Sequence, residues 1–162
     1  MGAQRALGGR RTHSHSDAEV IMLELVDRVT RRLRSGNRLC RTVVLRWRGH
    51  DMSAHTVSHS LDHPTDSTSH LVTEAKVLLD KAWDDIQPVG LSLLGFTAAN
   101  LSDASSVQLG LDLFGRDPTQ VDSTMDEVRD KFGNKALTRG SLVNHRPIEM
   151  PVLPDPGPAE PE

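Results

Sequence analysis

The chain has few of the residue types on which many functional sites depend. It holds one cysteine, Cys40, and no tyrosine among its 162 residues. A single cysteine cannot form an internal disulfide, so we expect a protein of the reducing cytoplasm. No apolar run is long enough to span a bilayer, and the first twenty residues lack the apolar stretch of a secretory signal, which excludes a membrane partner from our expectations. Nucleotide P-loops, dinucleotide fingerprints and patterns of nucleophilic catalysis are also missing.

The hydrophobic pattern of the first sixty residues predicts three strands and one helix. Residues 42–48 alternate between an apolar face with Val43, Leu45 and Trp47 and a partly basic face with Arg46 and Arg48, as a half-buried strand does. Apolar residues recur at helical spacing between 17 and 34, after a helix cap at Ser16-Asp17. We expect strands over residues 4–12, 42–48 and 53–61, and a helix over residues 17–34.

A second long helix and a fourth strand are predicted next. Asp66-Ser67 can cap the helix and Pro88 ends it, with an apolar stripe at helical spacing between them. A buried strand over residues 89–99 follows, in which Gly95 marks a bulge or a close backbone contact. The order βαββαβ indicates an α+β fold, with an antiparallel sheet, two long helices on one face and the other face open.

The last fifty residues contain a short apolar peptide and less regular segments. The heptapeptide Gln108-Leu-Gly-Leu-Asp-Leu-Phe114 is flanked on both sides by turn-forming residues, which argues against a core strand and favours a tethered docking peptide. An ordinary amphipathic strand is the alternative. Val121, Met125, Val128 and Phe132 predict a short amphipathic helix, and residues 136–142 can add a strand. From residue 147 onward, six prolines in sixteen residues predict a disordered tail.

Several segments together resemble a known family. The heptapeptide resembles the sliding-clamp-binding motif of bacterial DNA polymerases and repair proteins. Other stretches resemble, in order, the carboxy-terminal little-finger domain of Y-family DNA polymerases of the DNA polymerase IV type. These stretches are Gly2–Arg10, Arg41-Thr-Val-Val-Leu-Arg-Trp-Arg48, Ser58-His-Ser-Leu61 with Pro64-Thr-Asp66, and Gly90-Leu-Ser-Leu-Leu-Gly-Phe96 with Asn100-Leu101. The resemblance covers about residues 2–143.

The resemblance implies a role in translesion synthesis and DNA repair. Members of that family copy past damaged template bases, using palm-domain carboxylates and two magnesium ions. No stretch of this chain resembles the palm, fingers or thumb. We therefore expect no catalytic residue, no metal site, no cofactor in this chain and no enzyme activity of the chain alone. DNA and the polymerase sliding clamp are the expected partners of a monomer.

The same resemblance divides the chain and assigns the clamp contacts. The expected division is a tether and first strand (1–16), the little-finger core (17–101), a clamp-binding loop (102–118), a helix-strand extension (119–143) and a disordered proline-rich tail (144–162). The residues expected to bind the clamp are Gln108, Leu109, Leu111, Leu113 and Phe114.

The charge of the chain is unevenly distributed. Residues 1–50 hold eleven arginines against four acidic residues, although the whole chain has a net charge of −3. Guanidinium groups offer planar forks of donors that suit phosphate. We expect the open sheet face to hold DNA without reading its sequence. The residues expected to contact DNA are Arg5, Arg10, Arg11, Arg41, Arg46, Arg48, Ser58 and Ser60.

Two other functions fit parts of the pattern. A run of histidines with three spaced by four (His55, His59 and His63) could indicate a metal-dependent enzyme. On a strand, however, residues four apart lie about 13 Å apart and cannot share one ion. A small RNA-binding regulatory module has a similar layout, but such modules stack bases on exposed aromatic residues, and Trp47 is predicted to face the core. Phosphate contact is therefore favoured over base stacking.

Overall fold

The computed structural model describes residues 1–8, 13–106, 118–133, 136–137 and 140. The heptapeptide at 108–114 and the expected proline-rich tail lie outside these residues. The described part forms β1 (Gly2–Ala6), α1 (His15–Ser35), β2 (Arg38–Arg48), β3 (Ala54–Thr65), α2 (Thr68–Val89), β4 (Leu93–Asp103), a short 3₁₀ turn η1 (Ala104–Ser106) and α3 (Pro118–Phe132). Within it, no helix has both the length and the apolar character needed to cross a membrane.

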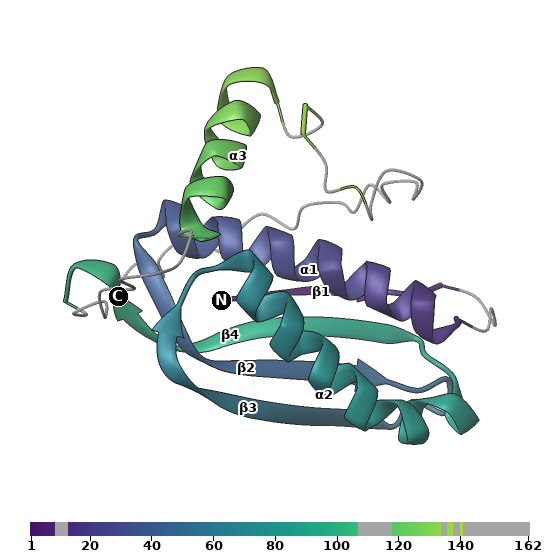
Figure 1. The fold of residues 1–162 in the computed structure, drawn as a ribbon. Helices are drawn as coiled ribbons and strands as arrows, with labels where there is room; N and C mark the ends of the chain where they lie inside the picture. Colours follow the sequence, from purple (N-terminus) through teal and green to yellow (C-terminus); the bar gives the residue numbers. More distant parts are fainter. Residues whose placement is uncertain (9–12, 107–117, 134–135, 138–139, 141–162) are drawn as a thin grey trace, which may run out of the picture.

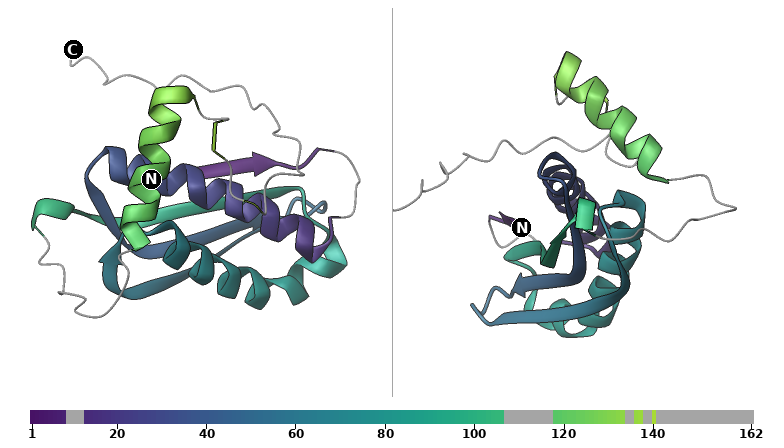
Figure 2. Two further views of the ribbon diagram at one scale, coloured as in Figure 1. Left: turned by 45° about the horizontal axis from the view of Figure 1, so that its top comes forward. Right: turned by 90° about the vertical axis from the view of Figure 1, so that its left-hand side faces the viewer.

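The sheet has four strands, and every neighbouring pair is antiparallel. The strand order is β1-β4-β2-β3, so the first and last strands of the βαββαβ unit lie side by side. Figure 1 shows α1 and α2 together on one side of this sheet, and Figure 2 shows the same two layers from other directions. The α+β fold with one open sheet face, which the sequence predicted, is confirmed.

The core lies between the sheet and the two long helices. From Val43 to Trp47 the odd-numbered residues of β2 point into it, because side chains alternate along a strand, and Trp47 is 2% exposed. The apolar stripes of α1 and α2 cover these residues. The largest fully buried side chains are Met22, Val26, Val29 and Leu33 of α1, Leu71, Leu79 and Ile86 of α2, Leu45 and Trp47 of β2, Leu94 and Phe96 of β4, and Leu91 between α2 and β4.

The two long helices differ in how the free backbone N–H groups of their first turns are hydrogen-bonded. The α1 helix starts two residues before the expected Asp17, because Ser14 and Asp17 form a capping box in which each side chain accepts from the other residue's backbone N–H. The α2 helix has Ser67 at its cap, but the Ser67 side chain makes no capping hydrogen bond. Pro88 lies in the last turn, and Gly90, with φ 72°, ends the helix.

Several strand boundaries differ from the sequence prediction. β2 begins at Arg38 rather than residue 42, β3 runs from 54 to 65 rather than from 53 to 61, and β4 begins at Leu93 rather than residue 89. β1 begins at residue 2 rather than 4 and ends at residue 6, where its pairing with residues 93–97 of β4 ends, and residues 9–12 of the expected strand lie outside the described residues. β4 runs to Asp103 rather than Ala99, because Arg38 at the start of β2 extends the pairing. The described residues 136, 137 and 140 of the expected last strand are not in a strand.

Candidate nucleic-acid interface

The open face of the sheet is built from four rows of residues that lie side by side across the strands. From Thr42 to Arg48, beyond the bulge between Cys40 and Thr42, the even-numbered residues of β2 point to this face, opposite the core. In the order β1-β4-β2-β3, the rows are Ala6-Leu93-Arg48-Ala54, Gln4-Gly95-Arg46-Thr56, Gly2-Thr97-Val44-Ser58 and, without a β1 partner, Ala99-Thr42-Ser60. Small and hydroxyl side chains dominate these rows, so the backbone of the sheet lies close to the surface.

Four of the residues expected to contact DNA share this face. Arg46 is exposed, and Arg48 is half-buried with its Nε 3.4 Å from Ser92 Oγ. Ser58 and Ser60 are exposed on the edge strand β3. The guanidinium groups therefore stand beside a row of hydroxyls, an arrangement that suits successive phosphate oxygens on a backbone.

Gly95 leaves the centre of the open face without a projecting side chain. A Cβ atom at this position would lie 3.2 Å from Gln4 Cβ, so a side chain here would crowd the neighbouring strand. The sequence prediction of a close backbone contact at Gly95 is confirmed, and its consequence is a smooth surface between Gln4 and Arg46. A polymer backbone can approach such a surface closely.

The remaining expected DNA contacts are not gathered on the open face. Arg5 points to the helix layer, where its Nη1 lies 2.6 Å from Glu24 Oε2 of α1, and its side chain is 11% exposed. The expectation for Arg5 was wrong about the face, because β1 begins at Gly2 and its odd residues share the side of the core. Arg41 lies at a bulge in the β2–β3 pairing, with its Nε 3.4 Å from Leu61 O. Arg10 and Arg11 lie outside the described residues.

Sequence reasoning missed several polar residues of the open face. Thr42 Oγ1 accepts a hydrogen bond of 2.8 Å from Asn100 Nδ2, and Thr56 and Thr97 stand in the same rows as Arg46 and Ser58. Strand alternation was the signal that could have identified them. No aromatic side chain of the described residues lies on this face, because Trp47 and Phe96 are in the core while Trp83 and Phe132 are on helices. Base stacking, the hallmark of the RNA-binding alternative, has no platform here.

The histidine run is spread over the other side of β3. His55 stacks on Trp47 with ring centroids 4.3 Å apart, and His59 lies 3.7 Å from Glu74 of α2. Both side chains therefore point toward the helix layer rather than to the open face. The strand itself is as expected, so His55, His59 and His63 are separated along it.

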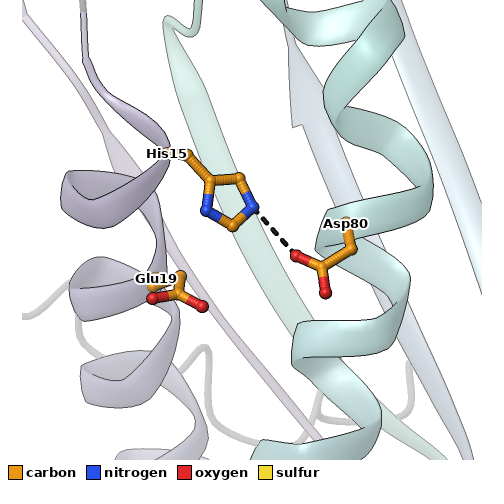
Figure 3. A group of neighbouring side chains, drawn as sticks. All are labelled: His15, Glu19 and Asp80. Atoms are coloured by element: carbon orange, nitrogen blue, oxygen red, sulfur yellow. Dashed lines mark hydrogen bonds and ion pairs between the residues drawn. The ribbon is translucent and has the colours of Figure 1, made fainter.

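One group within the described part has donors close enough to hold a cation. His15 and Glu19, four residues apart on α1, face Asp80 of α2, with ligand atoms within 4.8 Å of one another (Figure 3). These side chains already have partners. His15 Nε2 lies 2.9 Å from Asp80 Oδ1, and Glu19 lies 3.3 Å from the Lys76 ammonium. The group belongs to the helix layer and is separate from the open face.

The thiol of Cys40 is a core group. Its side chain is fully buried, and burial, followed by the nearby charge of Asp66, raises its pKa from 9.0 to about 11. A raised pKa disfavours the reactive thiolate at neutral pH. The geometry therefore indicates that Cys40 is a packing residue rather than a nucleophile.

Hydrogen bonds hold the chain at the end of β4, just before the heptapeptide. Asp103 Oδ1 accepts hydrogen bonds from the N–H and Oγ–H of Ser105, at 2.9 and 2.6 Å. These two bonds lower the pKa of Asp103. Asn37, at the turn before β2, donates to the same carboxylate oxygen, so the chain leaves the sheet from a defined position.

Comparison with known proteins connects the geometry to a family. Residues 1–111 match the family described as the impB/mucB/samB family C-terminal domain. The chain is 33% identical over 157 residues to DNA polymerase IV 2 of Mesorhizobium japonicum, which covers 87% of this chain and 37% of the relative. It is 30% identical over 130 residues to DNA polymerase IV of Moorella thermoacetica, covering 77% and 31%. The chain thus spans about a third of the length of these relatives.

A solved structure shares the fold. The post-insertion binary complex of Dbh DNA polymerase matches with a TM-score of 0.53 at 12% sequence identity, over 61% of this chain and 28% of that polymerase. At this identity the likeness concerns the fold alone. The matched family region ends at residue 111, so α3 lies beyond it.

Proposed function

The chain belongs to the impB/mucB/samB family C-terminal domain, the little-finger domain of Y-family DNA polymerases of the DNA polymerase IV type, and on this basis we propose that it holds DNA and binds a sliding clamp. The DNA is the primer-template duplex of translesion synthesis. It lies on the open face, against Arg46 and Arg48. The chain acts as a cytoplasmic monomer and needs no cofactor of its own. The two magnesium ions of the reaction belong to the polymerase.

The observation that carries the DNA proposal is the open face of the sheet, which no helix of the described residues covers and whose side chains are mostly small or carry hydroxyl groups. Arg46 and Arg48 alternate with core residues on β2, so the fold of the strand holds both guanidinium groups on one side. Phosphates attract such groups and release bound counterions, which makes binding salt-dependent and indifferent to base sequence. The absence of aromatic side chains from the described part of this face agrees with contact to the backbone rather than to bases.

Removing both arginines should weaken DNA binding equally on all sequences. We expect Arg46→Ala with Arg48→Ala to make the plot of log affinity against log salt shallower by about 2, because each lost phosphate contact reduces the slope by about 0.9. Fluorescence anisotropy of a labelled primer-template duplex over a series of salt concentrations measures this slope.

A matched control removes two positive charges from the helix layer. Lys76→Ala with Lys81→Ala changes the net charge equally but leaves the open face intact. If this control lowers affinity as much as the arginine pair does, net charge rather than the open face controls binding. A preference of the wild type for one base sequence would also contradict the proposal.

The clamp proposal depends on the heptapeptide. Gln108, Leu109, Leu111, Leu113 and Phe114 carry the motif and lie outside the described residues. The proposal is supported by the flanks of the peptide. β4 is followed by η1, which ends two residues before Gln108, and α3 begins four residues after Phe114, so the motif has an element of the domain on each side. Leu111, Leu113 and Phe114 enter an apolar groove of the clamp, and Gln108 forms hydrogen bonds at the rim.

We expect the chain alone to show no template-dependent nucleotide incorporation. Phosphoryl transfer of this type requires carboxylates that hold two metal ions about 4 Å apart, and no sequence stretch resembles the palm that supplies them. Primer extension with all four dNTPs and magnesium tests the expectation, with a complete DNA polymerase IV as the positive control. Incorporation that persists through repurification of the chain would contradict it.

A further inference from the structure

The α3 helix attaches to the domain through charged side chains. The buried residues of its described part are Asp122, at 3% exposure, and Arg129. Val121 and Phe132, the ends of the apolar stripe that the sequence predicts for this helix, are more than 60% exposed. Figure 1 shows α3 standing on the helix layer, away from the sheet. The usual apolar anchoring of a surface helix is therefore largely replaced by ion pairs and hydrogen bonds.

Arg34 of α1 is the centre of this junction. Its Nε lies 2.6 Å from Asp126 Oδ2, and its Nη1 lies 3.6 Å from Asp122 Oδ2. The same guanidinium donates to Asp66 O and Thr68 Oγ1 at 3.0 Å, just before and at the start of α2. Asp122 Oδ2 also accepts a 2.8 Å hydrogen bond from the N–H of Thr68. Asp122 thus supplies the cap that Ser67 does not provide.

Further ion pairs connect α3 to the same end of α1. Arg31 pairs with Asp130, and Arg129 Nη1 lies 2.9 Å from Asp27 Oδ2. Arg31 and Arg34 therefore face carboxylates of α3. On neighbouring positions of the α1 helix, Arg28 and Arg32 are exposed. The carboxy-terminal half of α1 is a basic surface, of which α3 covers one part.

Attachment of this kind has a small net free energy. The attraction within a buried ion pair is largely offset by the loss of hydration of both charges, and the exposed pair of Arg31 and Asp130 is screened by salt. Detaching α3 exposes little apolar surface, while detaching α1 or α2 would expose the whole core. α3 should therefore open locally long before the domain unfolds.

We propose that α3 is a detachable acidic cover over a second phosphate-binding surface, formed by Arg31 and Arg34 of α1. When α3 leaves, the phosphates of duplex DNA take the place of its carboxylates. This surface is on the helix layer, opposite the open face that carries the proposed function. We infer a phosphate ligand because carboxylates of α3 now contact these arginines. Phosphate and carboxylate oxygens both match the fork of donors on a guanidinium group.

Neutralising two carboxylates of the cover should expose this surface while the Asp122 side chain itself stays unchanged. In the full chain, Asp126→Asn with Asp130→Asn removes two acidic partners of the arginines and leaves Asp122 in place. We expect affinity for duplex DNA to rise about fivefold and the salt dependence to steepen by about 2 in log-log slope, as two added phosphate contacts require. Adding Arg31→Ala to this variant should remove about half of the added slope.

The matched control is Asp84→Asn with Asp85→Asn. These exposed residues change the net charge by the same amount but lie near the end of α2, whereas Asp122 of α3 contacts its start. We expect the affinity of this control variant for duplex DNA to stay within about twofold of the wild-type affinity. Equal gains in the two variants would mean that overall charge causes the effect and would overturn the proposal.

Hydrogen exchange tests the detachment directly. The amides of residues 121–132 should lose protection in Asp126→Asn with Asp130→Asn, while those of α2 beyond its first turn, where Asp122 accepts from the N–H of Thr68, stay protected. Retained protection of α3 would also overturn the proposal, since the cover would then not be held by these ion pairs. The Arg46 and Arg48 variant tests the open face separately, so each of the two surfaces can fail without the other.

Discussion

Changing Leu113 and Phe114 together to alanine should weaken binding to the sliding clamp by more than tenfold. Large apolar anchors dominate peptide–groove contacts, and truncating a buried anchor commonly costs about 2 kcal/mol or more. Each 1.4 kcal/mol corresponds to about a tenfold change in Kd. Titration of the wild type and the double variant against the purified clamp, by calorimetry or surface plasmon resonance, measures the loss.

The control for this experiment lies within the same peptide. Asp112→Ala changes a residue between the anchors and should alter the clamp affinity far less. The double variant should also keep the thermal midpoint of the wild type, because the turn-forming residues on both sides of the peptide predict a loop outside the core. A lowered midpoint would mean that Leu113 and Phe114 belong to a core strand. An unchanged clamp affinity would remove the docking hypothesis.

The architecture of the sheet and long helices could be predicted because the apolar residues of each element recur at the spacing of a strand or of a helix. In β2, Val43, Leu45 and Trp47 alternate with Arg46 and Arg48, so the strand and its two faces follow from local sequence. The stripes of α1 and α2 are equally continuous, and they face the buried side of β2. Local pattern and tertiary packing agree in these elements, which is why the open face was found correctly.

The face of a short edge strand could not be predicted in the same way. β1 has only five residues, and its sequence GAQRA contains no strong apolar alternation. The side of Arg5 depends on the register with Leu94 of β4, a residue almost ninety positions away in the chain. Once the register is known, Arg5 must share the side of the core, and Glu24 neutralises it. A one-residue shift would have put Arg5 on the open face.

The α3 junction was also beyond the reach of sequence patterns. The periodic stripe from Val121 to Phe132 correctly indicates a helix, but the buried contacts are made by Asp122 and Arg129. Their partners, Arg34, Thr68 and Asp27, lie 54 to 102 residues away in the chain. Ion pairs over such separations leave no periodic trace, so the sequence indicates a helix without indicating how it docks.

Truncating Leu78 should destabilise the domain while leaving DNA binding intact. Leu78 of α2 is 4% exposed and packs in the core between α2 and the sheet. Leu78→Ala creates a cavity that should cost about 2 to 5 kcal/mol of unfolding free energy. For a domain of this size, the thermal midpoint should fall by about 5 to 15 °C. Calorimetry or circular dichroism melting curves measure this change.

The adjacent Val77 provides the control, because it is 42% exposed on the same helix. Val77→Ala should change the unfolding free energy by no more than about 0.5 kcal/mol, since an exposed side chain leaves no cavity and alanine favours the helix. Well below its melting temperature, Leu78→Ala should bind duplex DNA as the wild type does, because Arg46 and Arg48 stand on the opposite face of the sheet. Equal destabilisation by both substitutions would place Leu78 outside the core. Weaker DNA binding by the folded Leu78 variant would instead indicate that DNA contacts the helix layer in the wild type.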